Sequence, residues 1–431
     1  MTTWTDNFIA YGEKYYAGVN RDFIKTTAYW IYATALGKRA YAPLGQLRLY
    51  PNMYLVLMAN RKRGKTLLTT TAEQIVHSIL PAQAKLPTDF SDEGFDDRLA
   101  DSQGHGYLHY RELIELLAHL DKAKKAVAKF NTFFDWSPID TISHTRMGGT
   151  KIIPAGTVMS FISGITPSAF ATGLRQTVLT SGGLSRFIIM RDENRTPLPP
   201  PPDTPDDYVP LLTAALRESL SNEYLQIKLN NDAREYWRYL NEEYMPKETA
   251  KAADPQMFEE ITARVDHHLI KCALVRAYQH HSITITEEHM HTAFNDVIEP
   301  YIRAAKLVAA DGIIENDYQR NRARIVERIR EQKTMFLRDL MMAVRMKRAS
   351  VIEILDELEA EGLIETVDSG RSTKWIYWND LREAHRPPPP ARDANKTKHT
   401  VATNGNRNGH IADPTNNGHI HPRSGQQSEI R

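Results

Sequence analysis

The spacing of hydrophobic residues changes several times along the chain, and each change predicts a different kind of element. Residues 5–45 carry large apolar side chains at helical spacing. Residues 46–192 mix helices with short apolar runs typical of buried strands, which we expect at Tyr54–Met58, Tyr107–Tyr110, Val158–Ile162 and Phe187–Met190. Residues 206–318 follow the helical period almost throughout. The pattern predicts an α/β core flanked by helical regions.

Two stretches of biased composition predict where the folded parts end. Residues 197–205 are rich in proline, which favours a stiff spacer. From residue 387 onward the chain is rich in Asn, Gly and Pro and nearly free of aromatic side chains, which favours disorder. We therefore expect a helical N-terminal region (1–45), an α/β core (46–196), a proline linker (197–205), a helical lid-like domain (206–319), a small module (320–384) and a disordered tail (385–431).

Composition and charge exclude some classes of protein. The 431 residues include 54 Lys and Arg against 53 Asp and Glu, so the net charge of +1 excludes a uniformly basic nucleic-acid coat but allows a local basic patch. The one cysteine, Cys272, excludes an intramolecular disulfide and a site with several cysteine ligands. No apolar run is long enough to span a membrane, and the start lacks a signal-peptide pattern. We expect a soluble, cytoplasmic protein with no membrane partner.

The strongest functional signal lies directly after the first expected core strand. The sequence ANRKRGKT (59–66) fits the phosphate-loop pattern, with alanine in place of the usual first glycine, and a helix is expected from about Leu67 to Leu80. The backbone N–H groups of such a loop hold phosphate, Lys65 reaches the terminal phosphates and Thr66 binds Mg²⁺. The predicted nucleotide-binding residues are Ala59, Asn60, Arg61, Lys62, Arg63, Gly64, Lys65, Thr66 and Leu67.

A phosphate loop implies an acid on a second strand, and Glu112 is the candidate because it ends the apolar stretch that begins at Gly106. Arg111 occupies the position where an Asp usually precedes the Glu. Glu112 would then act alone, either polarising the attacking water or binding Mg²⁺ through water. The alternative is an ordinary carboxylate at a helix start, which the helix dipole favours. The missing Asp predicts weak or partner-dependent hydrolysis.

Two further candidates lie at strand ends. Thr166 follows the apolar stretch 157–165, where nucleotide enzymes place a polar group beside the terminal phosphate; the alternative is a helix cap. Arg186 follows two glycines and precedes the strand at Phe187, so we expect it to reach phosphate, as a finger inserted into the site of a neighbouring subunit. For Arg186 the alternative is a surface salt bridge.

The order of these blocks resembles an uncharacterised, helicase-like family of phosphate-loop proteins that are fused to, or encoded beside, phage and plasmid primases. The resemblance covers about residues 30–192, and the helical region to about residue 310 follows in kind. It rests on LGKRAY (36–41), LYPNMY (49–54), RGKT (63–66), FSDEGF (90–95), YREL (110–113), GITP (164–167) and GLSRF (183–187), in this order.

The resemblance implies a RecA/AAA-like ATPase core and a role in DNA replication of mobile elements. The expected cofactors are ATP and Mg²⁺, and we expect a homo-oligomer. A primase block is absent from this chain, so a primase or other replication protein would be a separate partner. The helix that begins near residue 262 is similar to the lid helix of AAA-type helicases, in which an early arginine contacts the terminal phosphate; Arg264 is the matching residue. The histidine pairs at 267–268 and 280–281 lack the spacing of a metal site.

Residues 320–378 follow the pattern of a winged helix. Helices are expected at 323–331, 337–344 and 349–361, and strands at Leu363–Val367 and Trp375–Trp378 flank a wing loop rich in Gly and Ser. The stretch 320–348 is strongly basic, whereas the third helix is acidic, so protein docking is the alternative to DNA contact. The candidates for DNA contact, mainly to phosphate, are Arg345, Lys347, Arg348, Arg371 and Lys374.

The function expected from the sequence is that of an ATP-dependent, helicase-like DNA motor or remodeller. The alternative is a nucleotide-switched DNA-binding or loader protein that hydrolyses little ATP. A scaffold with a decayed loop is a third possibility, which the intact triplet Gly64-Lys65-Thr66 disfavours.

Overall fold

The computed structural model describes most of the chain up to residue 378. The described residues are 2–88, 92–116, 130–135, 140–145, 149–173, 183–194, 196, 198–199, 207–220, 223–311, 317–360, 363–368 and 374–378. The expected tail, most of the expected proline linker and Arg371 lie outside them. Within these ranges, no helix has the length and apolar character needed to cross a membrane.

A four-stranded, all-parallel β-sheet flanked by helices forms the centre of the larger part of the fold. Its strands, in spatial order, are β4 (His105–Glu112), β7 (Val158–Ile165), β3 (Tyr54–Ala59) and β8 (Phe187–Asp192). Every residue of β3 and β7 is buried, which explains why these strands are nearly continuous apolar runs in the sequence. The four expected strands are confirmed, and each is longer than expected. The arrangement is consistent with a Rossmann-like core.

Because the strands are parallel, their carboxyl ends share one edge, here called the carboxyl edge, and their starts share the opposite, amino edge. Tyr54 pairs with Phe161 and Phe187 near the amino edge, and Ala59 pairs with Asp192 at the carboxyl edge. A strand of six residues spans roughly 17 Å. Side chains at the two edges of one chain are therefore well separated.

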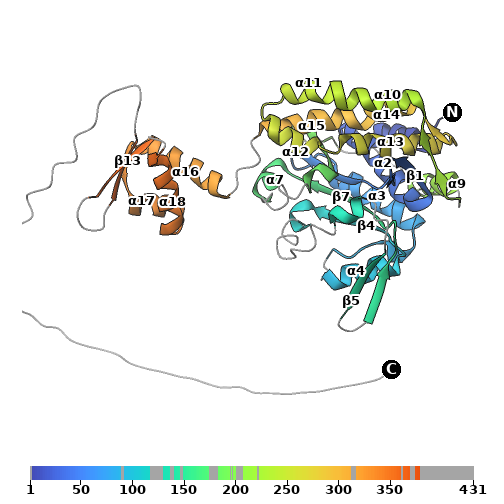
Figure 1. Cartoon of the computed structure of the whole chain (residues 1–431), viewed down its shortest axis with the longest axis horizontal. Helices are drawn as coiled ribbons and strands as arrows, with labels where there is room; N and C mark the ends of the chain where they lie inside the picture. Colours follow the sequence, from blue (N-terminus) through green and yellow to red (C-terminus); the bar gives the residue numbers. More distant parts are fainter. Residues whose placement is uncertain are drawn as a thin grey trace, which may run out of the picture.

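Helices α2 (Arg21–Leu36) and α3 (Lys65–Ile79) lie against this sheet (Figure 1), and α1 (Trp4–Tyr15) precedes them in the chain. α2 and α3 contact both β3 and β7, and α1 packs on α2. Nearly all of α2 is buried because it lies between the sheet and other helices, as expected of a helix that is apolar on most sides. α2 ends at Gly37, whose φ of +54° stops the helix, so the helical region expected to reach residue 45 is shorter.

Residues 208–310 are mainly helical, which confirms the helical period there. The first helix of this region packs against α3 and α1, and the helices from residue 231 onward form a layer (Figure 1). The helices are α9 (Tyr208–Ser219), α10 (Asn231–Tyr239), α11 (Met245–Ala250), α12 (Pro255–Thr262), α13 (Val265–Gln279), α14 (Glu287–Ala293) and α15 (Glu299–Ala310). Two π-helical turns, η4 (Leu240–Tyr244) and η5 (Phe294–Ile298), join α10 to α11 and α14 to α15. α15 contacts the edge strand β8 and so connects this layer to the sheet.

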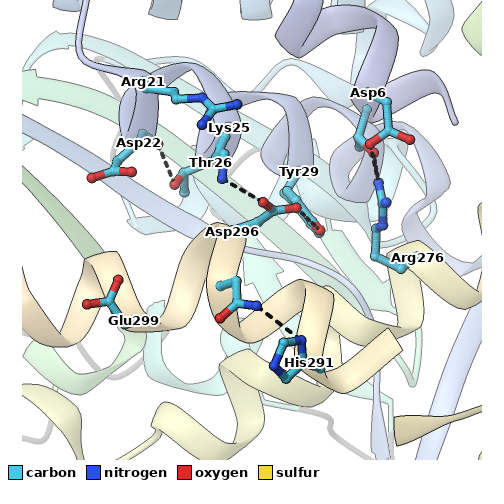
Figure 2. A network of polar contacts seen from close by, with 12 residues as sticks. Asp6, Arg21, Asp22, Lys25, Thr26, Tyr29, Arg276, His291, Asp296 and Glu299 are labelled. Carbon is cyan, nitrogen blue, oxygen red and sulfur yellow. Dashed lines mark hydrogen bonds and ion pairs between the residues drawn. The ribbon is translucent and has the colours of Figure 1, made fainter. Parts of the chain in front are cut away.

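Polar contacts tie the helical layer to the N-terminal helices (Figure 2). Asp296 of η5 accepts a hydrogen bond from Tyr29 Oη at 3.0 Å and forms an ion pair with Lys25 at 2.8 Å. Arg276 of α13 forms an ion pair with Asp6 at 2.8 Å. A continuous cluster of buried apolar residues runs from the N-terminal helices through the sheet to α15. The expected linker boundary stays a prediction, but the described residues on both sides of it share one hydrophobic core.

The remaining strands form small sheets. β1 (Ala40–Leu44) pairs with β2 (Leu47–Leu49) and with β9 (Leu225–Gln226), and β10 (Lys228–Leu229) pairs with β11 (Thr284–Ile285). β5 (Thr141–Thr145) and β6 (Gly149–Ile153) form an antiparallel hairpin, which α4 (Asp92–Asp101) contacts. Short 3₁₀ turns, η1 (Gly37–Arg39), η2 (Ala82–Ala84) and η3 (Leu184–Arg186), precede β1, β4 and β8 in the chain.

The C-terminal module has a hydrophobic core of its own. It consists of α16 (Asp317–Gln332), β12 (Thr334–Phe336), α17 (Leu337–Val344), α18 (Arg348–Ala360), β13 (Ile364–Asp368) and β14 (Lys374–Trp378), and the strands form an antiparallel sheet in the order β12-β14-β13. The core joins apolar side chains of the three helices to Ile364 and Ile376 of the sheet. The three expected helices and two expected strands are confirmed, whereas β12 is an additional strand.

Candidate functional site

Segments from four parts of the chain meet at the carboxyl edge of the sheet. The loop after β3 leads into α3, Glu112 ends β4, Thr166 follows β7 and Asp192 ends β8. Because β7 lies between β3 and β4, Thr166 has the loop on one side and Glu112 on the other. Four residues predicted from the sequence, Lys65, Thr66, Glu112 and Thr166, are thus brought to the same edge.

Lys65 is the first residue of α3, and its ammonium group turns back over the loop. Nζ donates hydrogen bonds to the backbone oxygens of Ala59 at 2.7 Å and Asn60 at 2.8 Å. The loop makes this turn with Gly64 at φ +80° and Lys62 at φ +59°, both in the left-handed region. The lysine charge therefore lies over the loop at the N-terminus of α3, where free N–H groups and the helix dipole favour an anion.

Two carboxylates act on this ammonium group. Partial burial lowers the pKa of Lys65, and the negative charges of Glu112 and Asp192 act in the opposite direction. Thr66, the next residue of α3, is exposed, and so is Leu67, at 41%. The edge thus combines a cation, an exposed hydroxyl group and carboxylates.

Glu112 reaches this position because β4 bulges just before its end. The pairing of β4 with β7 shifts by one residue, so that Arg111 falls outside the ladder and Glu112 pairs with Gly164. Gly164 pairs on its other side with Leu57 of β3. A Cβ on Gly164 would lie 3.3 Å from Cβ of Lys65, so the glycine lets the lysine pass close over β7. This role of Gly164 was not predicted, although the residue lies within the quoted block GITP.

Arg63 stabilises the shape of the loop from behind. Its side chain is 5% exposed, and its guanidinium group forms an ion pair with Asp192 at 2.9 Å. It also donates hydrogen bonds to the backbone oxygens of Thr196 and Gly18. Arg63 therefore ties the loop to the segment after β8 and to the α1–α2 junction. Asp192 was missed in the sequence, where the only signal was an acid at the end of an apolar strand.

Thr166 caps a helix as well as lying at the edge. Its Oγ1 accepts a hydrogen bond from the backbone N–H of Ala169 at 3.3 Å, at the start of α7 (Pro167–Gly173). The capping alternative is therefore present in the structure. Thr166 still lies between the loop and Glu112, so the cap is compatible with the expected contact to a terminal phosphate. That contact stays a prediction.

Arg186 and Arg264 lie at the amino edge instead. Arg186 ends η3 directly before β8, and Arg264 is the N-cap residue of α13. Both form ion pairs with Asp135, Arg186 Nη2 with Oδ2 and Arg264 Nη1 with Oδ1, each at 2.7 Å. The structure therefore brings the two arginines to each other but not to Lys65 of the same chain.

The amino edge also contains a buried lysine. Lys271 Nζ donates hydrogen bonds to Asn52 O, Asn52 Oδ1 and Phe134 O, each at 3.1 Å, and lies 3.6 Å from the centroid of the Phe134 ring. Complete burial lowers the pKa of Lys271 to about 7. Asn52 Nδ2 in turn donates to the backbone oxygens of Phe133, Phe134 and Met159. These contacts fix the backbone directly before Asp135.

A charged cluster joins α3 to β4. Glu73 Oε2 lies 2.6 Å from His109 Nδ1, and Glu73 Oε1 lies 2.6 Å from Lys85 Nζ. The hydrogen bond with His109, followed by that with Lys85, lowers the pKa of Glu73 to about 2. The cluster borders a cavity of about 1030 Å³ beside the edge strand. Through Glu73 and His109, this charged cluster connects α3, which begins with Lys65, to β4, which ends with Glu112.

Three of the expected DNA-contacting residues of the C-terminal module lie close together. Arg345 is the C-cap residue of α17, with φ +55°, and α18 begins at Arg348. Arg345, Lys347 and Arg348 are all exposed. Lys374 begins β14, and Arg371 lies outside the described residues. The module thus presents a small basic surface between α17 and α18.

The groups at the carboxyl edge fit a nucleoside triphosphate with Mg²⁺. Mg²⁺ takes only one or two protein ligands besides water and phosphate oxygens, and Thr66 and Glu112 would supply them. Among the described residues, no group of three or more His, Cys, Asp and Glu has the arrangement of a metal site. Of the histidines at 267–268 and 280–281, His268 is buried, with Nε2 3.0 Å from Ser185 O.

Comparison with models of known protein families gives no match for this chain, and comparison with curated proteins gives no significant similarity.

Proposed function

We propose that this chain binds ATP with Mg²⁺ at the carboxyl edge and hydrolyses it as a RecA/AAA-like phosphate-loop ATPase. The observation that carries the proposal is the meeting of Lys65, Thr66, Glu112 and Thr166 at the ends of three neighbouring parallel strands. Ligands of parallel α/β sheets bind at this edge. The loop, its helix and the neighbouring acid supply the parts that phosphoryl transfer needs.

Each residue has a separate role in the proposal. The N–H groups at the start of α3 hold the phosphates, and Lys65 exchanges its contacts with Ala59 O and Asn60 O for phosphate oxygens. Thr66 binds Mg²⁺, and Glu112 orients the attacking water. The bulge at Arg111 supports this role of Glu112, because it turns the arginine out of the ladder and sets the carboxylate opposite Gly164.

Arg186 would act on the nucleotide of a neighbouring copy of the chain. The roughly 17 Å between the two edges prevents Arg186 from reaching the loop of its own chain. A guanidinium group inserted from a neighbour can stabilise the charge that develops on the transferred phosphate. Arg264 shares Asp135 with Arg186, so we extend the same role in trans to Arg264.

DNA is the proposed partner of the ATPase, which would act as a helicase-like motor in the replication of a mobile element. The order of the sequence blocks supports this, together with the C-terminal module. Its three helices and antiparallel sheet follow the order of a winged helix, and Arg345, Lys347 and Arg348 are exposed where α17 leads into α18. Contacts from such residues would be mainly to phosphate and independent of sequence.

A nucleotide-switched DNA-binding or loader protein is the second candidate. One observation favours it: Glu112 acts without a neighbouring Asp, because Arg111 takes that position in the sequence and is turned out of the ladder. A single carboxylate is sufficient to bind Mg²⁺ through water but gives weaker support to hydrolysis. The switch would then follow nucleotide binding rather than turnover.

Steady-state ATP hydrolysis, measured with and without single-stranded DNA, tests the proposal and separates the two candidates. A motor hydrolyses ATP with multiple turnovers and is stimulated by DNA. A switch binds ATP, changes its affinity for DNA and turns over slowly in both conditions. If the chain binds no nucleotide in equilibrium dialysis with Mg²⁺-ATP, both candidates are wrong.

A further inference from the structure

One carboxylate at the amino edge is shared by two arginines. Asp135 Oδ1 accepts from Arg264 Nη1 and Oδ2 accepts from Arg186 Nη2, each at 2.7 Å. The side chains of Asp135 and Arg264 are about 30% exposed, so the pair borders the surface of the chain. Arg186 is more deeply buried, at 10%. Charge-assisted hydrogen bonds of this length are strong, and together the three groups leave a net positive charge.

Asp135 is held in place by a rigid support. The ammonium group of Lys271 lies over the ring of Phe134 and donates a hydrogen bond to the backbone oxygen of Phe134. Asn52 donates to the same oxygen. Lys271 lies on α13, the helix that Arg264 caps. A change in the position of Asp135 would therefore disturb buried hydrogen bonds, whereas the side chain of Arg264, at 27% exposure, borders solvent.

Other charged groups face the same place. His267 Nδ1 lies 3.3 Å from Arg264 Nη1, and Asp266 and Lys271 act on Arg264 or His267 through space. Desolvation lowers the pKa of Arg264, and the neighbouring Arg186 acts in the same direction. The arginines thus repel each other, and Asp135 balances this repulsion in the isolated chain.

We propose that Asp135 is a latch that holds Arg186 and Arg264 within their own chain until the phosphates of a nucleotide on a second copy displace it. This inference rests on the proposed function, because it needs a nucleotide at the carboxyl edge. It adds a residue that regulates assembly: Asp135 mimics the anion that the arginines meet in the oligomer.

The physical basis is competition between two anions for the same donors. The carboxylate carries one negative charge, whereas the terminal phosphate of ATP carries more and offers three oxygens to the two guanidinium groups. Each guanidinium has five N–H donors, so a phosphate can replace Asp135 without leaving the arginines unpaired. Assembly must first break the two contacts with Asp135, which lowers the affinity between copies of the chain.

Asp135→Asn in the full chain tests the latch. The amide keeps the shape of the side chain but removes its charge, so the ion pairs of Asp135 with Arg186 and Arg264 are lost. With Mg²⁺ and a non-hydrolysable ATP analogue, we expect the chain concentration at half-assembly, measured by light scattering, to fall about tenfold, since two charge-assisted hydrogen bonds no longer compete. ATPase activity in dilute protein should rise in parallel. An unchanged or higher half-assembly concentration would overturn the proposal.

Three variants distinguish a latch from a structural role. Asp135→Glu keeps the charge and should assemble like the unchanged chain, and Asp311→Asn is the matched control, because Asp311 pairs with Arg191 at 2.7 Å outside this cluster. Asp135→Asn combined with Arg186→Ala should lose the gain in assembly. If all variants show the same assembly, or if no nucleotide condition produces an oligomer, the latch is wrong.

Failure of the latch can be told from failure of the proposed function. Binding of a fluorescent ATP analogue to the monomeric chain reports the carboxyl edge alone, and Asp135→Asn should leave this affinity within about twofold of the unchanged chain because the edges are separate. Intact binding with unchanged assembly rejects the latch only. If the unchanged chain does not bind the ATP analogue, the proposed function and the latch are both rejected.

Discussion

The two edges of the central sheet have opposite chemistry. At the carboxyl edge, one ammonium group lies among backbone oxygens and is influenced by two carboxylates, Glu112 and Asp192. At the amino edge, two guanidinium groups share the carboxylate of Asp135, and the buried ammonium group of Lys271 lies beside Phe134, the residue before it. In the proposed function, the carboxyl edge binds a triphosphate with its metal, and the amino edge donates hydrogen bonds to an anion. One chain therefore holds both halves of the proposed site, but at opposite edges of the sheet.

The largest expected effect comes from the carboxyl edge. Lys65→Ala should reduce ATP turnover on the order of 10³-fold or more, because a cation is removed from the place where phosphate charge develops. Measurement of binding and turnover, together with the melting temperature, checks this. Lys247→Ala is a matched control, since this lysine is 64% exposed and pairs with its helical neighbour Glu243. Unchanged affinity and turnover in Lys65→Ala would show that the loop does not bind phosphate.

The amino edge should affect turnover without affecting binding. Arg186→Ala chains should bind ATP normally and hydrolyse it on the order of 10³-fold more slowly, since a transition-state cation is lost. Arg238→Ala, on the exposed face of α10, serves as the control. Mixing Arg186→Ala with Lys65→Ala chains should restore part of the turnover, because a mixed interface pairs an intact loop with an intact arginine. If the chains exchange but no mixture regains ATP turnover, Lys65 and Arg186 act in the site of the same chain.

Substitution of Gly164, which lies in β7 between β4 and β3, should have an intermediate effect on ATP binding. Gly164→Val should weaken ATP binding about tenfold, because a Cβ at this position already lies 3.3 Å from Cβ of Lys65 and the branched side chain adds two methyl groups. Gly164→Ala should have a smaller effect of the same sign. Isothermal calorimetry measures both, and equal affinities for the three chains would mean that Lys65 does not need this close approach.

The smallest expected effect concerns the link between α3 and β4. The pKa of Glu73 is about 2 instead of its usual 4.5, so its contacts stabilise the fold fully above pH 4.5. This stabilisation is lost as the pH falls from 4.5 toward 2, where the folded state also takes up the proton. Because solvent screens the cluster, we expect Glu73→Gln to cost only about 1 kcal/mol at pH 7. Chemical unfolding at pH 7 and at pH 3 should show the difference from the unchanged chain shrinking at the lower pH.

Much of the carboxyl edge could be predicted from the sequence. Buried parallel strands are continuous apolar runs, so β3, β4, β7 and β8 were visible, and residues that follow such strands must meet at one edge. This placed Lys65, Thr66, Glu112 and Thr166 together. The bulge at Arg111 could not be predicted, because it depends on the pairing of β4 with β7 rather than on the composition of β4.

The partners of the arginines could not be predicted from the sequence. Arg63 pairs with Asp192, 129 residues away, and Arg264 pairs with Asp135, also 129 residues away. Spacing within a helix or strand carries no information about such contacts, since tertiary packing alone decides them. For the same reason the sequence indicated that Arg264 lies near a helix start but not which edge of the sheet that start approaches.

Residues on both sides of the expected proline linker share one hydrophobic core, which limits how the chain can be divided. Trp4 Nε1 donates to Leu212 O at 2.9 Å, and the Tyr11 ring stacks on Tyr208 with centroids 4.0 Å apart. A gene split at the proline-rich stretch would yield two fragments that each expose a large apolar surface. Such fragments would have to be made together and to associate permanently, like the halves of a split reporter protein. An inserted flexible peptide at the same place would leave these contacts intact.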